Sequence, residues 1–319
     1  MRSSGFVHSV KDPFEPMTFE TQRLNLPAAA TARDVRRAML FRESLADVVE
    51  RWVLGLAWAV KPPRLYGLPN LARMCFHELL APDYALPDPE RALDKPYGLA
   101  GIVHGFSLST LLAAHWRGLY PIAHVGPLKW WSPPQRSVLF FNETHISKSL
   151  RRDMRRNRYT VTFDRDFDAV IAACAERRSG RWHVTWITPR IMRVYAELFD
   201  AGYAHSFEVW NEKGELAGGG YGVALGNIFV TESQFSREPN TSKIGFTTLN
   251  CHLAKWGFAL NDGKIMTTVC RDMGFREISR RDYLARLAQA ERAPGKPGRW
   301  DVEAGMAAVA DWQPSKPNA

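Results

Sequence analysis

Apolar positions in the first part of the chain recur at helical spacing. Between Thr31 and Val60 they come at mostly three- and four-residue steps, and Pro62-Pro63 ends the pattern, which predicts one long helix. A second helix is expected around Leu71 to Leu80, before the prolines at 82, 87 and 89. The most hydrophobic stretch, Trp52 to Val60, is much shorter than the roughly 20 residues of a membrane-spanning helix, so we interpret it as buried helix.

After residue 158 the pattern alternates between strand and helix periods. Strands are expected at 159–163, 206–210, 215–225 and 227–232, and helices at 167–176, 189–198 and 242–258, before the chain returns to the sheet near Ile265. Thr188-Pro189 supplies an N-cap followed by proline at the first helical position. The resulting order β-α-α-β-β-β-α-β resembles an acetyltransferase-like (GNAT) fold, which belongs to the α+β class.

These patterns divide the chain into four segments. We predict a helical N-terminal extension at 1–94, a small N-terminal α/β domain with a basic helix at 95–157, a GNAT-like domain with a mixed sheet flanked by helices at 158–290, and a loosely ordered tail at 291–319.

Composition is that of an ordinary globular protein, with 45% hydrophobic and 24% charged residues. The net charge is +9, and because residues 1–94 hold equal numbers of basic and acidic side chains, the whole excess lies after residue 94. That distribution favours a polyanionic partner. The four cysteines show neither CxxC nor secretory spacing, so we expect no metal site and no disulfide framework, and the N-terminus lacks an apolar signal region, so we expect a cytoplasmic protein with no membrane partner.

One short segment concentrates the positive charge. Residues 148–158 read Lys-Ser-Leu-Arg-Arg-Asp-Met-Arg-Arg-Asn-Arg, and on a helix the apolar Leu150 and Met154 would anchor the side opposite the basic residues. The six basic residues fall at offsets 0, 3, 4, 7, 8 and 10 and are predicted to contact RNA phosphates: Lys148, Arg151, Arg152, Arg155, Arg156 and Arg158. On charge alone, a solvated helix without a partner is an equal alternative.

A set of segments between Trp130 and Leu284 carries a family resemblance. They are Trp130-Trp-Ser-Pro133, Arg136-Ser-Val-Leu139, His145 to Leu150, Val161 to Asp164, Trp186 to Pro189, Ala204 to Trp210, Gly218 to Ala224, Glu232 to Arg237, Asn240 to Lys243 and Glu277 to Leu284. Together they resemble the leucyl/phenylalanyl-tRNA protein transferases. A weaker match, Arg117-Gly-Leu-Tyr-Pro121, extends the similarity back to about Gly98.

The resemblance implies an N-degron type aminoacyltransferase. Aminoacyl-tRNA is the expected donor, with its terminal adenosine in a pocket and its acceptor stem on the basic helix, and the acceptor is a protein or peptide with a free N-terminal amine. No cofactor is expected, and we expect a monomer. The segment Arg237 to Ser242 also lacks the glycines that a pyrophosphate-binding loop would need, which disfavours acetyl-CoA.

Three residues are predicted to act in catalysis: Asp262, Glu232 and Lys264. The reaction, aminolysis of an ester, needs two positioned substrates, a site for the amine proton and stabilisation of the oxyanion. Asp262 could instead form a turn in Asn261-Asp262-Gly263, and Glu232 could form an ion pair at a strand end. Lys264 stands where the family has a neutral amide, and stabilising the oxyanion, binding phosphate and acting as a base remain open roles.

The resemblance also implies a substrate-binding set, namely Trp186, Gly220, Gln234, Phe235, Ser236 and Asn261. Trp186 is expected near the aminoacyl-adenosine, with core packing as the alternative. Gly220, Gln234 and Asn261 replace apolar family residues, which predicts a more polar amino-acid pocket and altered donor specificity. Two other readings stay open: a non-catalytic tRNA- or RNA-binding relative, and a GNAT-type acetyltransferase.

Overall fold

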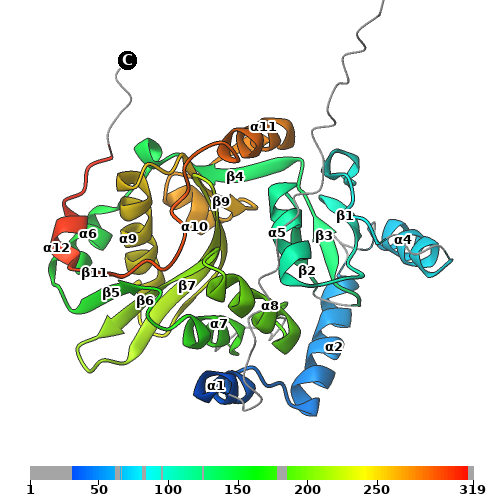
Figure 1. Ribbon diagram of the computed structural model, residues 1–319, viewed down its shortest axis with the longest axis horizontal. Coiled ribbons are helices and arrows are strands. Elements are labelled where there is room, and N and C mark those ends of the chain that lie inside the picture. Colours follow the sequence, from blue (N-terminus) through cyan, green and yellow to red (C-terminus); the bar gives the residue numbers. More distant parts are fainter. Residues whose placement is uncertain are drawn as a thin grey trace, which may run out of the picture.

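The computed structural model describes residues 31–61, 65, 67–80, 84–94, 96–123, 126–177 and 185–314. The predicted extension and tail therefore lie partly outside the described residues. Two sheets and the helices that cover them make up this part of the chain (Figure 1). The result is a mixed α+β fold with a large sheet flanked by helices, as the sequence predicts.

The N-terminal segment forms helices α1 (Ala32–Leu40), α2 (Leu45–Ala59) and α4 (Leu68–Leu80). The single helix predicted from Thr31 to Val60 is wrong, because Ser44 caps a new helix: its side chain accepts a hydrogen bond from the Asp47 amide, and Asp47 bonds back in a capping box. Helix α1 lies against α7 (Phe167–Ala175) and α8 (Pro189–Asp200), where Arg37 binds Asp168 at 3.0 Å and Asp200 at 2.6 Å.

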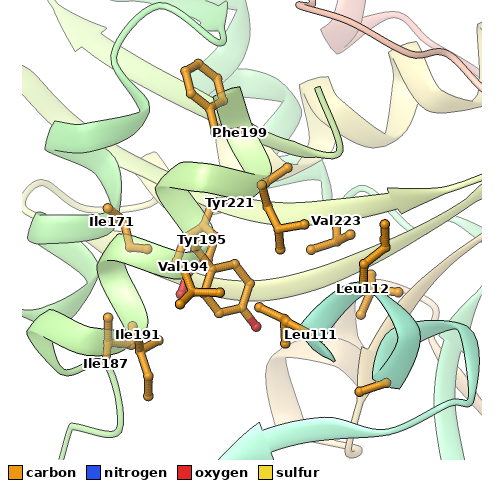
Figure 2. Close-up of a cluster of buried hydrophobic side chains, with 14 of the residues drawn as sticks. Leu111, Leu112, Ile171, Ile187, Ile191, Val194, Tyr195, Phe199, Tyr221 and Val223 are labelled. Carbon is orange, nitrogen blue, oxygen red and sulfur yellow. The ribbon is translucent and has the colours of Figure 1, made fainter. Parts of the chain in front are cut away.

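A three-stranded sheet follows, with strand order β1-β3-β2. Its strands are β1 (Leu99–Ile102), β2 (Tyr120–Ile122) and β3 (Lys129–Trp131), and a short 3-10 helix, η1 (Pro89–Arg91), precedes them. Helix α5 (Leu108–Trp116) connects β1 to β2 and packs on α8. Figure 2 shows Leu111 and Leu112 of α5 among the same buried side chains as Val194 and Tyr195 of α8 and Tyr221 of the large sheet.

The large sheet has the order β10-β4-β9-β8-β7-β6-β5-β11, and within the described residues its neighbouring strands are antiparallel except the parallel pair β8–β9. The strands are β4 (Gln135–Leu139), β5 (Tyr159–Phe163), β6 (Ala204–Asn211), β7 (Leu216–Leu225), β8 (Ile228–Ser236), β9 (Leu260–Lys264), β10 (Arg276–Ser279) and β11 (Val302–Ala304). Because β4 pairs with β9 and β10, this sheet joins the two segments that the sequence places in separate domains at residue 157.

Helices cover both faces of this sheet, which separates two hydrophobic cores. One core includes side chains of α5, α7 and α8, and the other includes side chains of α9 (Thr241–Lys255) and α6 (Lys148–Arg155). The remaining elements are η2 (Phe141–Glu143), α10 (Thr268–Asp272), α11 (Arg280–Ala290) and α12 (Met306–Ala310). Within the described residues, no helix combines the length and apolar character needed to cross a bilayer.

The C-terminal segment is integrated into the fold, whereas the sequence predicts a loosely ordered tail. Strand β11 pairs with β5, and the buried Trp300 stacks on His205 with ring centroids 3.6 Å apart. The Trp300 backbone N–H also donates to the Asp164 carboxylate at 2.7 Å. The prolines and glycines between 294 and 298 therefore precede strand β11, which is held in the large sheet. Composition alone does not predict this strand.

Candidate active site

Glu232 and Lys264 meet where the parallel pair β8–β9 ends. The last paired residues are Val230 and Asp262, and Glu232 and Lys264 each follow two positions later on their own strand. Both residues therefore lie just beyond the end of the pairing on neighbouring strands, where their side chains meet. The Lys264 ammonium donates to Oε2 of Glu232, and both side chains are buried.

The backbone at Lys264 is fixed by local contacts. Gly263 is the extra residue of a bulge against β4, where Ser137 pairs with Lys264 and Val138 pairs with Asp262. Lys264 adopts φ of 65°, in the left-handed region that lysine rarely occupies. Its N–H donates to Oδ1 of Asp262 at 2.8 Å, which supports this conformation. Asn261-Asp262-Gly263, a turn candidate from sequence, is part of a strand instead.

Glu232 is held ionised by two partners. His115 contacts Oε1 through Nε2 at 2.8 Å, while Lys264 occupies Oε2. Complete burial alone would raise the pKa of Glu232, but the charges and hydrogen bonds of Lys264 and His115 outweigh it and lower the pKa to about 2. Burial lowers the pKa of Lys264, and Glu232 opposes that change. Glu232 is therefore a paired anion and a poor proton acceptor.

His115 faces hydrogen-bond acceptors on both ring nitrogens. Its Nδ1 lies 2.8 Å from the carbonyl oxygen of Leu111, one helical turn earlier, and its Nε2 lies 2.8 Å from the Glu232 carboxylate. The two contacts tie the buried His115 ring both to the backbone of α5 and to the Glu232 carboxylate.

Asp262 is locked into a second charge pair on the same side of the sheet. Arg136 of β4 donates from Nε to Oδ1 at 2.9 Å and from Nη2 to Oδ2 at 2.7 Å, and the Tyr283 hydroxyl donates to Oδ2 at 2.7 Å. Burial alone would lower the pKa of Arg136, but the Asp262 charge keeps it above the usual value. Asp262 has no exposed surface, so this geometry makes it a positioning group for Lys264.

Aromatic side chains surround this charged group. The Lys264 ammonium lies 5.3 Å from the ring centroid of Tyr120 and 6.0 Å from that of Trp186. Behind them, the rings of Tyr195 and Tyr221 meet edge to face at 5.3 Å. The hydroxyls of Tyr120 and Tyr221 are buried and have no hydrogen-bond partner, and burial together with the neighbouring Glu232 raises the pKa of Tyr195. We refer to His115, Arg136, Glu232, Asp262 and Lys264 as the charge cluster.

The predicted pocket residues divide between the two faces of the sheet. Phe235 belongs to the same hydrophobic core as α5 and α8, and half-buried Trp186 packs against that core. Asn261 is buried on the α9 face: its amide group donates to Asn250 at 2.7 Å, and its oxygen accepts from Thr231 at 2.7 Å. The polar groups of Asn261 are therefore already paired within the protein.

Gly220 and Ser236 have structural functions as well. A Cβ on Gly220 would lie 2.7 Å from the Phe207 ring and 2.8 Å from Cγ of Gln234, so these side chains occupy the volume that the glycine leaves free. Ser236 is exposed and accepts a hydrogen bond from the Ser242 amide at the start of α9. Gly220 therefore leaves no empty volume at this position.

The basic residues of α6 lie on the surface as predicted, with Leu150 and Met154 buried beneath them. Lys148, Arg152, Arg155, Arg156 and Arg158 are exposed. Arg151, however, donates to the backbone carbonyls of Ala310 and Trp312, and Arg155 pairs with Asp311 at 2.8 Å. The C-terminal segment thus engages part of this basic surface.

Sequence reasoning missed His115, Arg136 and Tyr283 as members of the site. Arg136 and Tyr283 occur in the matched segments 136–139 and 277–284, but nothing in the pattern marks them as partners of Asp262. His115 lies in an apolar helix, four residues after Leu111, where a histidine is usually structural. In the described part of the chain, no group of three or more acidic, histidine or cysteine side chains is placed to hold a metal ion.

Comparison with known proteins identifies related chains. Residues 138–288 match the family model described as leucyl/phenylalanyl-tRNA protein transferase. A transferase of that name from Pseudomonas fluorescens (strain Pf0-1) is 48% identical over 204 residues, which cover 63% of this chain and 89% of the relative. The protein of that name from Anaeromyxobacter sp. (strain Fw109-5) is 42% identical over 224 residues, covering 70% and 94%.

Proposed function

Because the chain belongs to the leucyl/phenylalanyl-tRNA protein transferase family, we propose that it moves an amino acid from aminoacyl-tRNA to the N-terminal amine of a protein or peptide. The observation that carries the catalytic part of this proposal is the buried Lys264–Glu232 pair beside the anchored Asp262. Lys264 carries the proton, and its contact with Glu232 fixes the position of the ammonium. Aminolysis of an ester requires both a proton-bearing group and its fixed placement.

In the proposed reaction, the acceptor nitrogen bonds to the ester carbonyl carbon and a tetrahedral oxyanion forms. The Lys264 ammonium is the hydrogen-bond donor for this oxyanion, because a buried cation stabilises developing negative charge strongly. The bond between that carbon and the ribose oxygen then breaks. The leaving oxygen takes a proton from Lys264, and the proton lost by the amine restores the ammonium.

The other members of the charge cluster orient Lys264 in this proposal. Glu232 and the Asp262 carboxylate fix its side chain and its backbone N–H, respectively. Glu232 itself does not act as the base, since its pKa is lowered to about 2. Phosphates of the tRNA acceptor stem lie on α6 and the turn that follows it, where Arg152, Arg156 and Arg158 are exposed.

We also propose that the large sheet is GNAT-like. The antiparallel run β5-β6-β7-β8 followed by the parallel neighbour β9 supports this assignment. In such a sheet, the charge cluster lies where the parallel pairing stops, at the position expected for the reacting ends of the substrates.

A polar donor amino acid is the third part of the proposal. Asn261, Asn250 and Thr231 form a buried polar group on the α9 face, and Nδ2 of Asn250 has no hydrogen-bond partner. Gly220, Gln234 and Asn261 also stand where the family resemblance places apolar residues, and this substitution pattern is what supports a changed donor preference. Donors with a hydrogen-bonding side chain should therefore be preferred.

A screen with purified protein tests the function directly. Each aminoacyl-tRNA is offered with a peptide mixture, transfer is followed by mass spectrometry, and co-purifying tRNA is sequenced. We expect transfer from a small set of donors in which leucine and phenylalanine do not lead. Bound tRNA without transfer from any donor would indicate the non-catalytic alternative, and acetyl-CoA binding without tRNA would indicate an acetyltransferase.

A further inference from the structure

Helix α2 exposes a face that carries no charge. Its exposed large apolar residues, with the C-cap residue included, form what we call the apolar stripe: Leu45, Val49, Trp52, Val53, Leu56 and Val60. At about 100° per residue they fall within an arc of about 100° on one side of the helix. Among the described residues from 45 to 60, the only other exposed residue is Ala46. The prediction that Trp52 to Val60 is buried is therefore wrong on this side, where Trp52 is 46% exposed and Leu56 54%.

The charged side chains of α2 bind other parts of the same chain. Arg51 donates from Nε to Glu43 at 2.7 Å, and Arg177 donates from Nη1 to Glu50 at 2.8 Å. Asp47 forms the capping box in the first turn. A surface helix ordinarily presents polar residues to solvent, and α2 presents apolar ones instead. An exposed apolar face of this kind indicates an interaction surface.

The spacing of the apolar stripe is the same from either end. Its steps are four, three, one, three and four residues, so it is symmetrical about the midpoint between Trp52 and Val53. Two copies of α2 that lie antiparallel about a twofold axis at that midpoint set each stripe residue opposite an apolar residue, for example Val49 opposite the partner's Leu56. Steps of three and four residues are also those of helices that pack knobs into holes. A surface that is complementary to itself in this way fits a twofold dimer.

The exposed area is large enough for such a dimer. The six side chains are 46% to 85% exposed. Covering them on both copies would bury on the order of 1,000 Å² in total, about the lower limit for a specific protein interface. The two ends of the helix also carry opposite charges, with Asp47 in the first turn and Lys61 after the C-cap. Antiparallel pairing brings each end beside the opposite end of the partner helix.

A lipid surface fits this face less well than a second copy does. Helices that lie on anionic membranes carry several Lys and Arg residues on their polar face. Helix α2 has one arginine, Arg51, which binds Glu43, and two acidic residues, Asp47 and Glu50. The charge of the helix therefore gives no attraction to an anionic bilayer.

We infer that α2 is the contact between two copies of this chain, which pair antiparallel through the apolar stripe. The inference goes beyond the proposed function and does not depend on it. Helix α2 lies at the periphery, away from the large sheet, and outside the residues 138–288 that match the family model (Figure 1). The monomer expected from the sequence is thereby replaced by a dimer whose contact lies in the N-terminal extension, and each copy keeps its own charge cluster.

Sedimentation equilibrium of the full chain tests the dimer. We expect a mass of twice 36.1 kDa that falls on dilution, because an interface of this size is small. L56E puts a carboxylate against the partner's stripe twice in each dimer and should weaken association by about tenfold or more. The matched control L80E changes an exposed leucine of α4 and should keep the dimer.

Folding is checked on the dilute, dissociated protein. Leu56 is exposed in the single copy, so L56E should leave its thermal unfolding unchanged. A wild-type protein that stays monomeric, whether free or bound to phosphatidylglycerol vesicles, would overturn the inference. A dimer that L56E does not weaken would overturn it too.

Cysteine pairing tests the antiparallel geometry without adding a charge. V49C and L56C are purified separately, mixed and oxidised, and the linked peptides are identified by mass spectrometry. The two new thiols meet only in the mixture if the helices are antiparallel, so a disulfide between positions 49 and 56 should be the main product. Links between identical positions, which a parallel pair would give, or no link between 49 and 56 would overturn the inference. Neither experiment measures transfer, so its failure leaves the proposed function intact.

Discussion

Arg136 binds both carboxylate oxygens of Asp262, with contacts of 2.9 Å and 2.7 Å, and both side chains are almost fully buried. They lie 126 residues apart in the chain, on neighbouring strands β4 and β9. The pair fixes strand β9, which carries Lys264. The same contact therefore stabilises the protein and positions Lys264 in the site.

Breaking this pair should destabilise the protein. Asp262→Asn leaves the buried Arg136 guanidinium without a counter-charge, so we expect the free energy of unfolding to fall by about 3 to 5 kcal/mol, measured by urea denaturation. The double variant Arg136→Met/Asp262→Leu should lose less than the two single changes together. Additive losses, or wild-type stability for Asp262→Asn, would contradict a coupled pair.

Stability should depend on pH through Glu208. Burial raises the pKa of this carboxyl to about 7 from the model-compound value of 4.5, although hydrogen bonds from Ser206 and Thr162 oppose the shift. The folded state then binds more protons than the unfolded state between these values, so the free energy of unfolding should fall as pH rises from about 4.5 to about 7. Glu208→Gln should flatten this slope in denaturation curves, while the exposed control Glu215→Gln should retain it.

Phosphate contacts on α6 should be visible in the salt dependence of tRNA binding. Arg152→Ala and Arg156→Ala should each weaken binding and reduce the slope of log K against log salt by about 0.9. Arg151→Ala should change the slope less, because backbone carbonyls of the C-terminal segment already bind this side chain. Arg91→Ala, an exposed change near β1, serves as the charge control. Unchanged slopes in folded Arg152 and Arg156 variants would remove α6 from the RNA surface.

Trp300 should contribute strongly to stability although it lies in the segment expected to be a tail. It is 1% exposed and stacks on His205, so Trp300→Ala should cost about 3 to 5 kcal/mol in thermal or urea unfolding. Trp52→Ala, at an exposed position of α2, should cost little. Similar stabilities for the two variants would show that the C-terminal segment adds nothing to the core.

Much of the fold follows from local patterns. The strand predicted at 159–163 and the helices predicted at 189–198 and 242–258 all correspond to elements of the structure, although the Thr188 side chain makes no capping hydrogen bond. The break between α1 and α2 was missed because apolar spacing continues across it, whereas the Ser44 capping box interrupts the backbone hydrogen bonds. The sequence does not predict the packed C-terminal segment, because its Pro and Gly residues indicate turns and loops. They carry no information on the pairing of β11 with the distant strand β5.

The sequence by itself determined the family, the basic helix and three members of the charge cluster, Glu232, Asp262 and Lys264, because each depends on residue types at fixed local spacing. Only the tertiary structure brought His115 to Glu232 across 117 residues and Arg136 to Asp262 across 126. Those contacts depend on strand register, on the bulge at Gly263 and on the packing of α5, none of which local periodicity encodes. The pairing of the buried charges in the site was therefore decided by the fold.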